Sequence, residues 1–165
     1  MVVAALMVAR AMATATTPVP DGGAIAITAP PGWSASAGAE AGRFEVLWAA
    51  AQNRSLDPEA LSRTTQYRDY SVWKDVPHDR VLVRVGTAFS PAVRDMSLPD
   101  AAFPLDWSHA ERLPDDWGFA VWQLRFSLRQ VPYVVVAHIG PDATPLDWAL
   151  VRAVIATVRP AGSAR

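Results

Sequence analysis

The chain has 165 residues, of which 51% are hydrophobic and 19% charged, a composition typical of one globular domain rather than of a disordered segment. Its formal net charge is −1, and no basic stripe is present that would neutralise a row of phosphates, so nucleic-acid binding is not expected. Cysteine is absent, which excludes thiol catalysis, thiolate-bound zinc and disulfides.

An apolar segment, residues 1–17, opens the chain, and its first charged residue is Arg10. The apolar run before Arg10 is too short to span a bilayer, which takes about 20 residues. It has the length of a signal-peptide hydrophobic region, and small-x-small sequences end at Ala13 and Ala15, although no basic residue precedes it. Two interpretations stay open: a signal or anchor remnant that associates with a membrane, or an apolar helix that docks on the domain or on a partner.

The rest of the chain divides by composition. Residues 18–23 are rich in Pro and Gly, as in a linker. Residues 24–160 are expected to form a single domain, and residues 161–165 a short tail. Together with the apolar N-terminus, this organisation predicts an extracytoplasmic protein that is exported or membrane-anchored, with a cytoplasmic location as the alternative.

Alternation of apolar and polar residues predicts the first strands. A weak strand is expected at 24–28. Stronger patterns cover 44–50 and 80–89.

The clearest alternation covers residues 118–128, where every second residue from Ala120 faces one side. Residues 131–139 are apolar on both faces apart from His138, so this strand should be covered on both sides. The short connection between the two segments predicts an antiparallel hairpin.

Two helices are expected. The first covers about 57–70, with Asp and Pro at its start. The second begins at Thr144 as N-cap, with Pro145 as its first residue, and runs toward Thr157. Its β-branched end leaves a final strand as an alternative. On a helical wheel this helix is apolar over about twice the usual stripe of ~100°, so it is sandwiched or its outer flank meets a partner.

Helices do not separate the predicted strands regularly, which disfavours a parallel, doubly wound sheet. We therefore predict an α+β fold with a single antiparallel β-sheet and helices packed on it, and with a long acidic loop rich in Trp and Pro between two strands.

Three segments of the chain resemble the PsbP-like fold: an early Pro-Pro-Gly-Trp element ending at Trp33, a late hairpin carrying Tyr133 and Val134, and a closing run from Leu150 to Arg159. That family includes photosystem accessory proteins and bacterial extracytoplasmic proteins of the DcrB type. The resemblance covers about residues 22–160 and implies a small accessory module, often exported and usually without enzymatic activity. The long acidic loop departs from the family's compact pattern.

No catalytic set is recognisable. The three histidines, 31 and 29 residues apart, fit no metal-binding motif, and no nucleophile elbow, P-loop or dinucleotide fingerprint occurs. His138 is expected as a core histidine, and His78 and Asp79 as a solvated turn pair. A hydrolase that uses His78 or His109 with a nearby acid is the least favoured alternative. We predict no catalytic residue, no metal and no cofactor.

Tryptophan is over-represented, with seven residues, and three of them end a Pro-x-Asp-Trp sequence. The connection 91–117 holds four prolines, and six acidic residues lie between 94 and 116. It is either an aromatic and acidic surface for a sugar, a cation or a partner protein, or a packed loop whose aromatic side chains plug the end of the sheet. The candidate binding residues are Trp107, His109, Asp115, Asp116, Trp117, Trp148 and Arg152.

From these observations we expect a non-enzymatic, extracytoplasmic accessory or interaction domain that docks on a protein partner or a membrane complex. The alternative is a module that binds a small ligand or a carbohydrate through the 94–117 loop.

Overall fold

The computed structural model describes residues 12–18, 24–40, 46–54, 77–87, 98, 100–114 and 118–161. The elements in these ranges are, in chain order, β1 (Ala13–Pro18), β2 (Ala24–Ala29), β3 (Ser34–Glu40), β4 (Val46–Gln52), β5 (Val81–Thr87), the 3₁₀ helix η2 (Trp107–His109), β6 (Glu111–Leu113), β7 (Ala120–Leu128), β8 (Val131–Ile139), α3 (Pro145–Ala156) and β9 (Arg159–Pro160).

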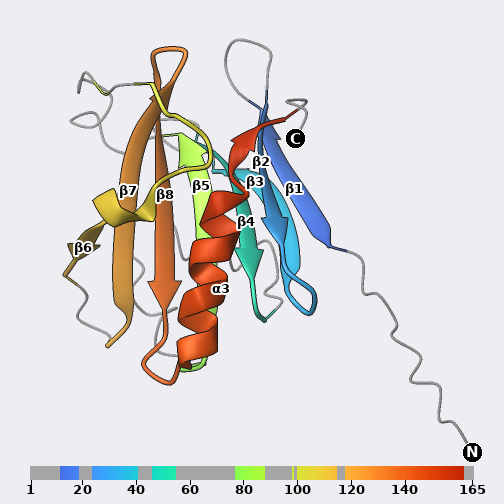
Figure 1. The fold of residues 1–165 in the computed structure, drawn as a ribbon. Helices are drawn as coiled ribbons and strands as arrows, with labels where there is room; N and C mark the ends of the chain where they lie inside the picture. The colour runs from blue at the N-terminus through green and yellow to red at the C-terminus, as the bar shows by residue number, and fades with distance from the viewer. Residues whose placement is uncertain are drawn as a thin grey trace, which may run out of the picture.

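The strands form two antiparallel sheets, so the prediction of a single sheet with helices packed on it is wrong. The large sheet has the order β3-β4-β5-β8-β7-β6, and the small sheet the order β1-β2-β9 (Figure 1). Within the described ranges α3 is the one α-helix, so the fold is mostly β rather than α+β. The helix expected at 57–70 lies outside those ranges. The long loop is described at 98 and 100–114, and it contains η2 and β6.

Strand β1 lies where the sequence predicted the end of an apolar segment and the start of a linker. It pairs with β2 over its whole length, from Ala13 opposite Ala29 to Pro18 opposite Ala24. Ala15 and Thr17 are buried while Thr14 and Thr16 are exposed, which is the alternation of a strand with one face on a core. Residues 13–18 therefore belong to the folded domain, and cleavage after Ala15 would cut a paired strand.

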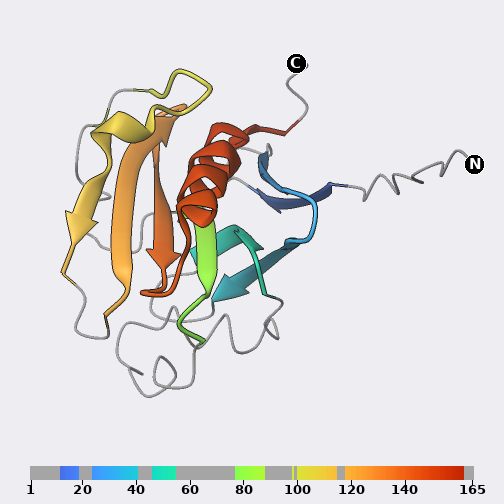
Figure 2. The ribbon, with the colours of Figure 1, turned by 60° about the horizontal axis from the view of Figure 1, so that its bottom comes forward.

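One face of the large sheet, the inner face, carries the main core. Helix α3 contacts β5 and β8 of this sheet as well as β2 and η2, and β1 and β2 contact β3 and β4. Figure 2 shows the helix beside the small sheet, on the same side of the large sheet. The core is made of fully buried side chains from the helix and both sheets, among them Ile25, Ile27, Val83, Val85, Val135, Ile139, Val151, Ile155 and Val158.

The opposite or outer face of the large sheet is also buried at its centre. Leu82 and Arg84 of β5 and Val134 and Val136 of β8 alternate with the core residues, and each is at most 8% exposed. The prediction that residues 131–139 are covered on both sides is therefore confirmed.

Several predicted elements are confirmed. Strands β2, β5, β7 and β8 occupy the expected segments, and β4 overlaps the segment expected at 44–50 and runs on to Gln52. The hairpin of β7 and β8 is antiparallel, and its turn residues Arg129 and Gln130 both have positive φ, as a two-residue hairpin turn requires. Helix α3 begins at Thr144 with a capping box, and it ends as a helix rather than a strand.

The helical wheel is only partly confirmed. Val151, Val154 and Ile155 are buried, but Leu146 is 67% exposed and Ala153 is also exposed. The outer flank of the predicted apolar stripe therefore faces solvent.

Strand β3 has no counterpart among the predicted strands. Its sequence, Ser-Ala-Ser-Ala-Gly-Ala-Glu, lacks the branched and aromatic residues that favour strands. The small residues have a packing reason, because a Cβ on Gly38 would lie 2.6 Å from Cζ2 of Trp48 on β4. Gly38 thus makes room for the indole of Trp48, which is 1% exposed.

Gly140, directly after β8, is the tightest position in the described fold. A Cβ there would lie 1.9 Å from the carbonyl oxygen of His78, and the Gly140 N–H donates to the carbonyl of Arg80 at 2.8 Å. Because backbone cannot yield as a flexible side chain does, Gly140→Ala should lower the free energy of unfolding by about 1–3 kcal/mol in urea denaturation. Ala102→Ser at an exposed position serves as control. A loss in Gly140→Ala below about 0.5 kcal/mol would contradict the close approach.

Candidate functional site

The structure describes four of the seven predicted site residues, and these four form two groups. Asp115, Asp116 and Trp117 lie outside the described residues. Trp107 and His109 are in η2. Trp148 and Arg152 lie on α3. Although about 40 residues of chain separate the two groups, η2 and α3 are in contact.

Trp122 of β7 joins these two groups. Its ring centroid lies 6.2 Å from that of Trp107, with the planes tilted by 47°, and 6.5 Å from that of Trp148, with the planes at 88°. Separations of this size are typical of aromatic side chains in direct contact. We call Trp107, Trp122 and Trp148 the tryptophan cluster. Each is partly buried against the main core and keeps part of its surface in solvent.

The local sequence explains how Trp107 reaches the cluster. Asp106 is the N-cap of η2 and accepts a hydrogen bond from the Ser108 N–H at 2.9 Å. Further back along the loop, Leu105 is buried, and Phe103 packs edge-on against Phe126 of β7 at 6.2 Å. The aromatic side chains of this loop segment therefore do pack on the sheet, and the packing fixes the position of Trp107.

Trp148 is positioned by the same kind of device. The Thr144 N–H donates to Oδ2 of Asp147 at 2.7 Å, and the Asp147 N–H donates to the Thr144 hydroxyl at 3.3 Å. This capping box fixes the first turn of α3, from which Trp148 projects. Two copies of Pro-x-Asp-Trp thus start helices and bring their tryptophans to one place, whereas the third copy, ending at Trp117, lies outside the described residues.

Polar groups surround the cluster. Nε2 of His109 lies 3.5 Å from Oδ2 of Asp106, and both side chains are exposed. Hydrogen bonds from Ser108, followed by the charge of His109, hold the pKa of Asp106 below its usual value. Arg152 is exposed on the neighbouring turn of α3. Inside the cluster, the Nε1–H of Trp122 is buried and has no acceptor. The arrangement offers apolar ring surface and a charged rim, while the unpaired N–H of Trp122 is buried.

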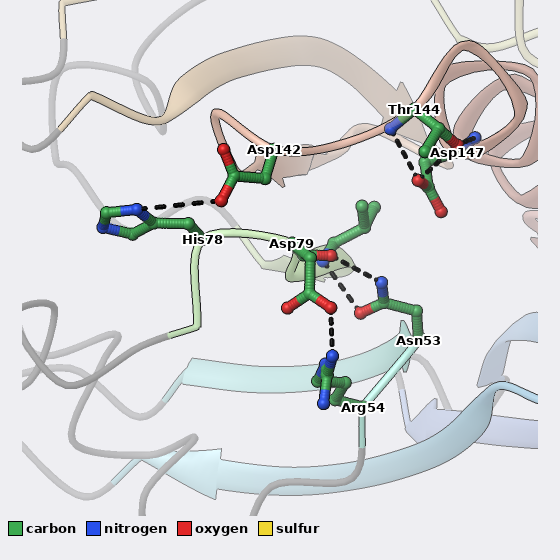
Figure 3. A network of polar contacts seen from close by, with 8 residues as sticks. Asn53, Arg54, His78, Asp79, Asp142, Thr144 and Asp147 are labelled. Atoms are coloured by element: carbon green, nitrogen blue, oxygen red, sulfur yellow. Dashed lines mark hydrogen bonds and ion pairs between the residues drawn. The ribbon is translucent and has the colours of Figure 1, made fainter.

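A second group of polar side chains lies at one end of the large sheet, where three loops meet (Figure 3). Arg54 pairs with Asp79, and the hydrogen bond from Arg54 lowers the pKa of Asp79. Asn53 donates to the Asp79 carbonyl at 2.8 Å and accepts from the Val81 N–H at 2.9 Å. Exposed ion pairs stabilise proteins little, so we assign the Asn53 hydrogen bonds the main role of holding the turn before β5.

His78 belongs to the same loops, and its Nδ1 lies 4.0 Å from Oδ2 of Asp142. His78 and Asp79 occupy a turn, as expected. The side chains of His78 and His109 are 65% and 78% exposed, so each has an acid nearby without the buried, hydrogen-bonded setting of a catalytic triad. His138 is only partly buried and lies on the outer face, so the prediction of a core position holds in part.

Among the residues that the structure describes, no three His, Asp or Glu side chains come together in a way that would hold a metal ion. In the same residues, no helix has both the length and the apolar character needed to cross a bilayer. Comparison with protein-family models, curated proteins and solved structures gives no match. The PsbP-like resemblance therefore stays a prediction.

Sequence reasoning did not identify Trp122 as a site residue. Its strand and its apolar face were predicted, but nothing local to β7 indicates that η2 and α3 both fold onto it. The one available signal is its size, since Trp122 is the largest residue on that face of β7.

Trp122 should therefore support its two partners. Trp122→Ala leaves a cavity and is expected to lower the free energy of unfolding by about 3–5 kcal/mol, with a red shift in the emission of the remaining indoles. Trp122→Phe keeps a ring and removes the unpaired N–H, so its change should stay within about 1 kcal/mol. Chemical denaturation followed by circular dichroism measures both. Equal effects of the two substitutions would contradict this role.

The cap of η2 should depend on pH. Because the folded state lowers the pKa of Asp106, the cap is fully present above the usual value of 3.8 and is lost as pH falls through the lowered pKa. In an NMR titration, the Ser108 amide resonance should move with a midpoint below pH 3.8, and Asp106→Asn should abolish the movement. A midpoint at or above the usual value would show that Asp106 does not cap η2 in solution.

Proposed function

We propose that the protein is a non-enzymatic accessory domain that binds its ligand at the tryptophan cluster. The observation that carries the proposal is the convergence of two capped helix starts, which deliver the partly exposed rings of Trp107 and Trp148 to Trp122, whose N–H lacks an acceptor. Rigid aromatic side chains lose little conformational entropy on binding, so they are favoured as contact residues.

The chemistry of the cluster favours a carbohydrate as ligand. Indole faces pack against the apolar C–H faces of a sugar ring, and sugar hydroxyls supply acceptors for an indole N–H. The carboxylate of Asp106, at the start of the turn that carries Trp107, accepts hydrogen bonds from further hydroxyls. A hydroxyl-rich ligand thus pairs with the rim carboxylate while its ring packs on the indoles.

A second candidate, docking on a protein partner, is favoured by a different observation. Leu146 is 67% exposed on the flank of α3 that faces away from the tryptophan cluster, and Ala153 on the same flank is also exposed. The apolar start of the chain supports the related proposal that the domain acts outside the cytoplasm, next to a membrane complex.

Sugar binding is tested by intrinsic fluorescence. Titration with neutral oligosaccharides built from glucose, galactose, mannose, arabinose or N-acetylglucosamine should give a saturable change in emission with at least one of them. Trp107→Ala and Trp148→Ala should weaken that binding at least tenfold, since each removes one ring of the surface.

The matched control is Trp33→Phe, which removes an indole from outside the cluster and should leave the affinity unchanged. Circular dichroism checks that all variants are folded. The carbohydrate proposal fails if the wild-type protein responds to none of these sugars, or if the two cluster variants bind as the wild-type protein does.

A further inference from the structure

A buried cation with an incomplete set of partners lies on the outer face of the large sheet. Arg80 directly precedes β5 and is 2% exposed. Its Nη2 donates to Oε1 of Gln52, the last residue of β4, at 2.6 Å, and Gln52 is 1% exposed. The other guanidinium nitrogens of Arg80, Nε and Nη1, are buried and have no hydrogen-bond partner.

The charge of Arg80 persists in this setting. Burial lowers the pKa of Arg80 to about 10, which still leaves the guanidinium protonated at neutral pH. Among the described residues, a neutral amide is its one hydrogen-bond acceptor, and no carboxylate pairs with it. Buried charges in proteins are normally paired, because an unpaired one is strongly destabilising. Within the described part of the chain, Arg80 therefore lacks the anionic partner that its burial calls for.

Neighbouring residues add positive charge to the same face. Arg84 follows Arg80 by four positions, so both side chains lie on the outer side of β5, and Arg84 is 6% exposed. His138 of β8 stands opposite Leu82, between the two arginines. Desolvation and the charges of Arg84 and Arg80 lower the pKa of His138 to about 3, so its ring is neutral at physiological pH.

We infer that Arg80, together with Gln52 and Arg84, binds an oxyanion, the phosphate or carboxylate group of a small molecule. The unpaired Nε and Nη1 of Arg80 supply the donors, and arginine is the side chain best suited to both groups. Arg80 and Gln52 are themselves almost fully buried, so an anion reaches them only when this part of the outer face opens. The site is on the face opposite to Trp122 and does not depend on the proposed function.

The direct test observes Arg80 itself. In ¹H–¹⁵N spectra of the ¹⁵N-labelled full chain, the Nε–H resonance of Arg80, assigned with Arg80→Met, should shift saturably on titration with inorganic phosphate, sulfate or acetate. Sodium chloride keeps the ionic strength constant. A response to phosphate and sulfate alone indicates a phosphate ligand, whereas a response to acetate indicates a carboxylate.

Variants provide the second measurement. The same anions should raise the melting temperature of the wild-type protein and of Arg112→Gln, which removes an exposed arginine from β6. They should not raise that of Arg80→Met. In anion-free buffer, the double variant Arg80→Met with Gln52→Leu should melt no lower than the wild-type protein, because it replaces an unpaired buried charge and the amide that contacts it with apolar side chains.

Two results would overturn the inference. One is an Arg80 resonance that moves no more with phosphate, sulfate or acetate than with chloride, which would mean that water alone completes the guanidinium. The other is an Arg80→Met and Gln52→Leu double variant that melts well below the wild-type protein in anion-free buffer, which would mean that the charge is already paired.

Discussion

Burial of β5 and β8 on both faces is the constraint on which the rest of the fold depends. Their sequences are apolar almost without interruption, so a sheet with these strands at its centre has to be covered on both sides. On the inner face, α3, the small sheet and η2 supply the cover. On the outer face, Leu82, Val134 and Val136 are buried with Arg84, so charged groups share this layer with apolar ones.

The two faces consequently present different chemistry. At the β7 side of the inner face, covering elements that start at helix caps leave three indoles in contact and partly exposed, which suits an uncharged ligand with apolar faces and hydroxyls. On the outer face, the end of β5 holds a guanidinium whose hydrogen bonds are incomplete. The turn that Asn53 holds, drawn in Figure 3, leads directly into Arg80.

The sequence predicts the elements whose signals are local. The hairpin of β7 and β8 follows from alternation and a short turn, and the start of α3 from Thr144, Pro145 and Asp147. Strand β3 escapes prediction because it lacks branched and aromatic residues, and its Gly38 is explained only by contact with Trp48 of the neighbouring strand. The second sheet escapes because alternation shows that a segment is extended but does not identify its partner. The tryptophan cluster needs the same long-range information, since Trp122 meets its partners only after η2 and α3 fold over β7.

The most direct test of two-sided burial is thiol labelling, which the absence of native cysteine makes unambiguous. Leu82→Cys probes the outer face of β5, Val83→Cys the inner face, and Ala102→Cys is an exposed control. If both faces are covered, the first two thiols react with a thiol reagent orders of magnitude more slowly than the third in buffer and at the same rate in denaturant. Labelling of Leu82→Cys at the rate of the exposed control, in a folded protein, would contradict the account.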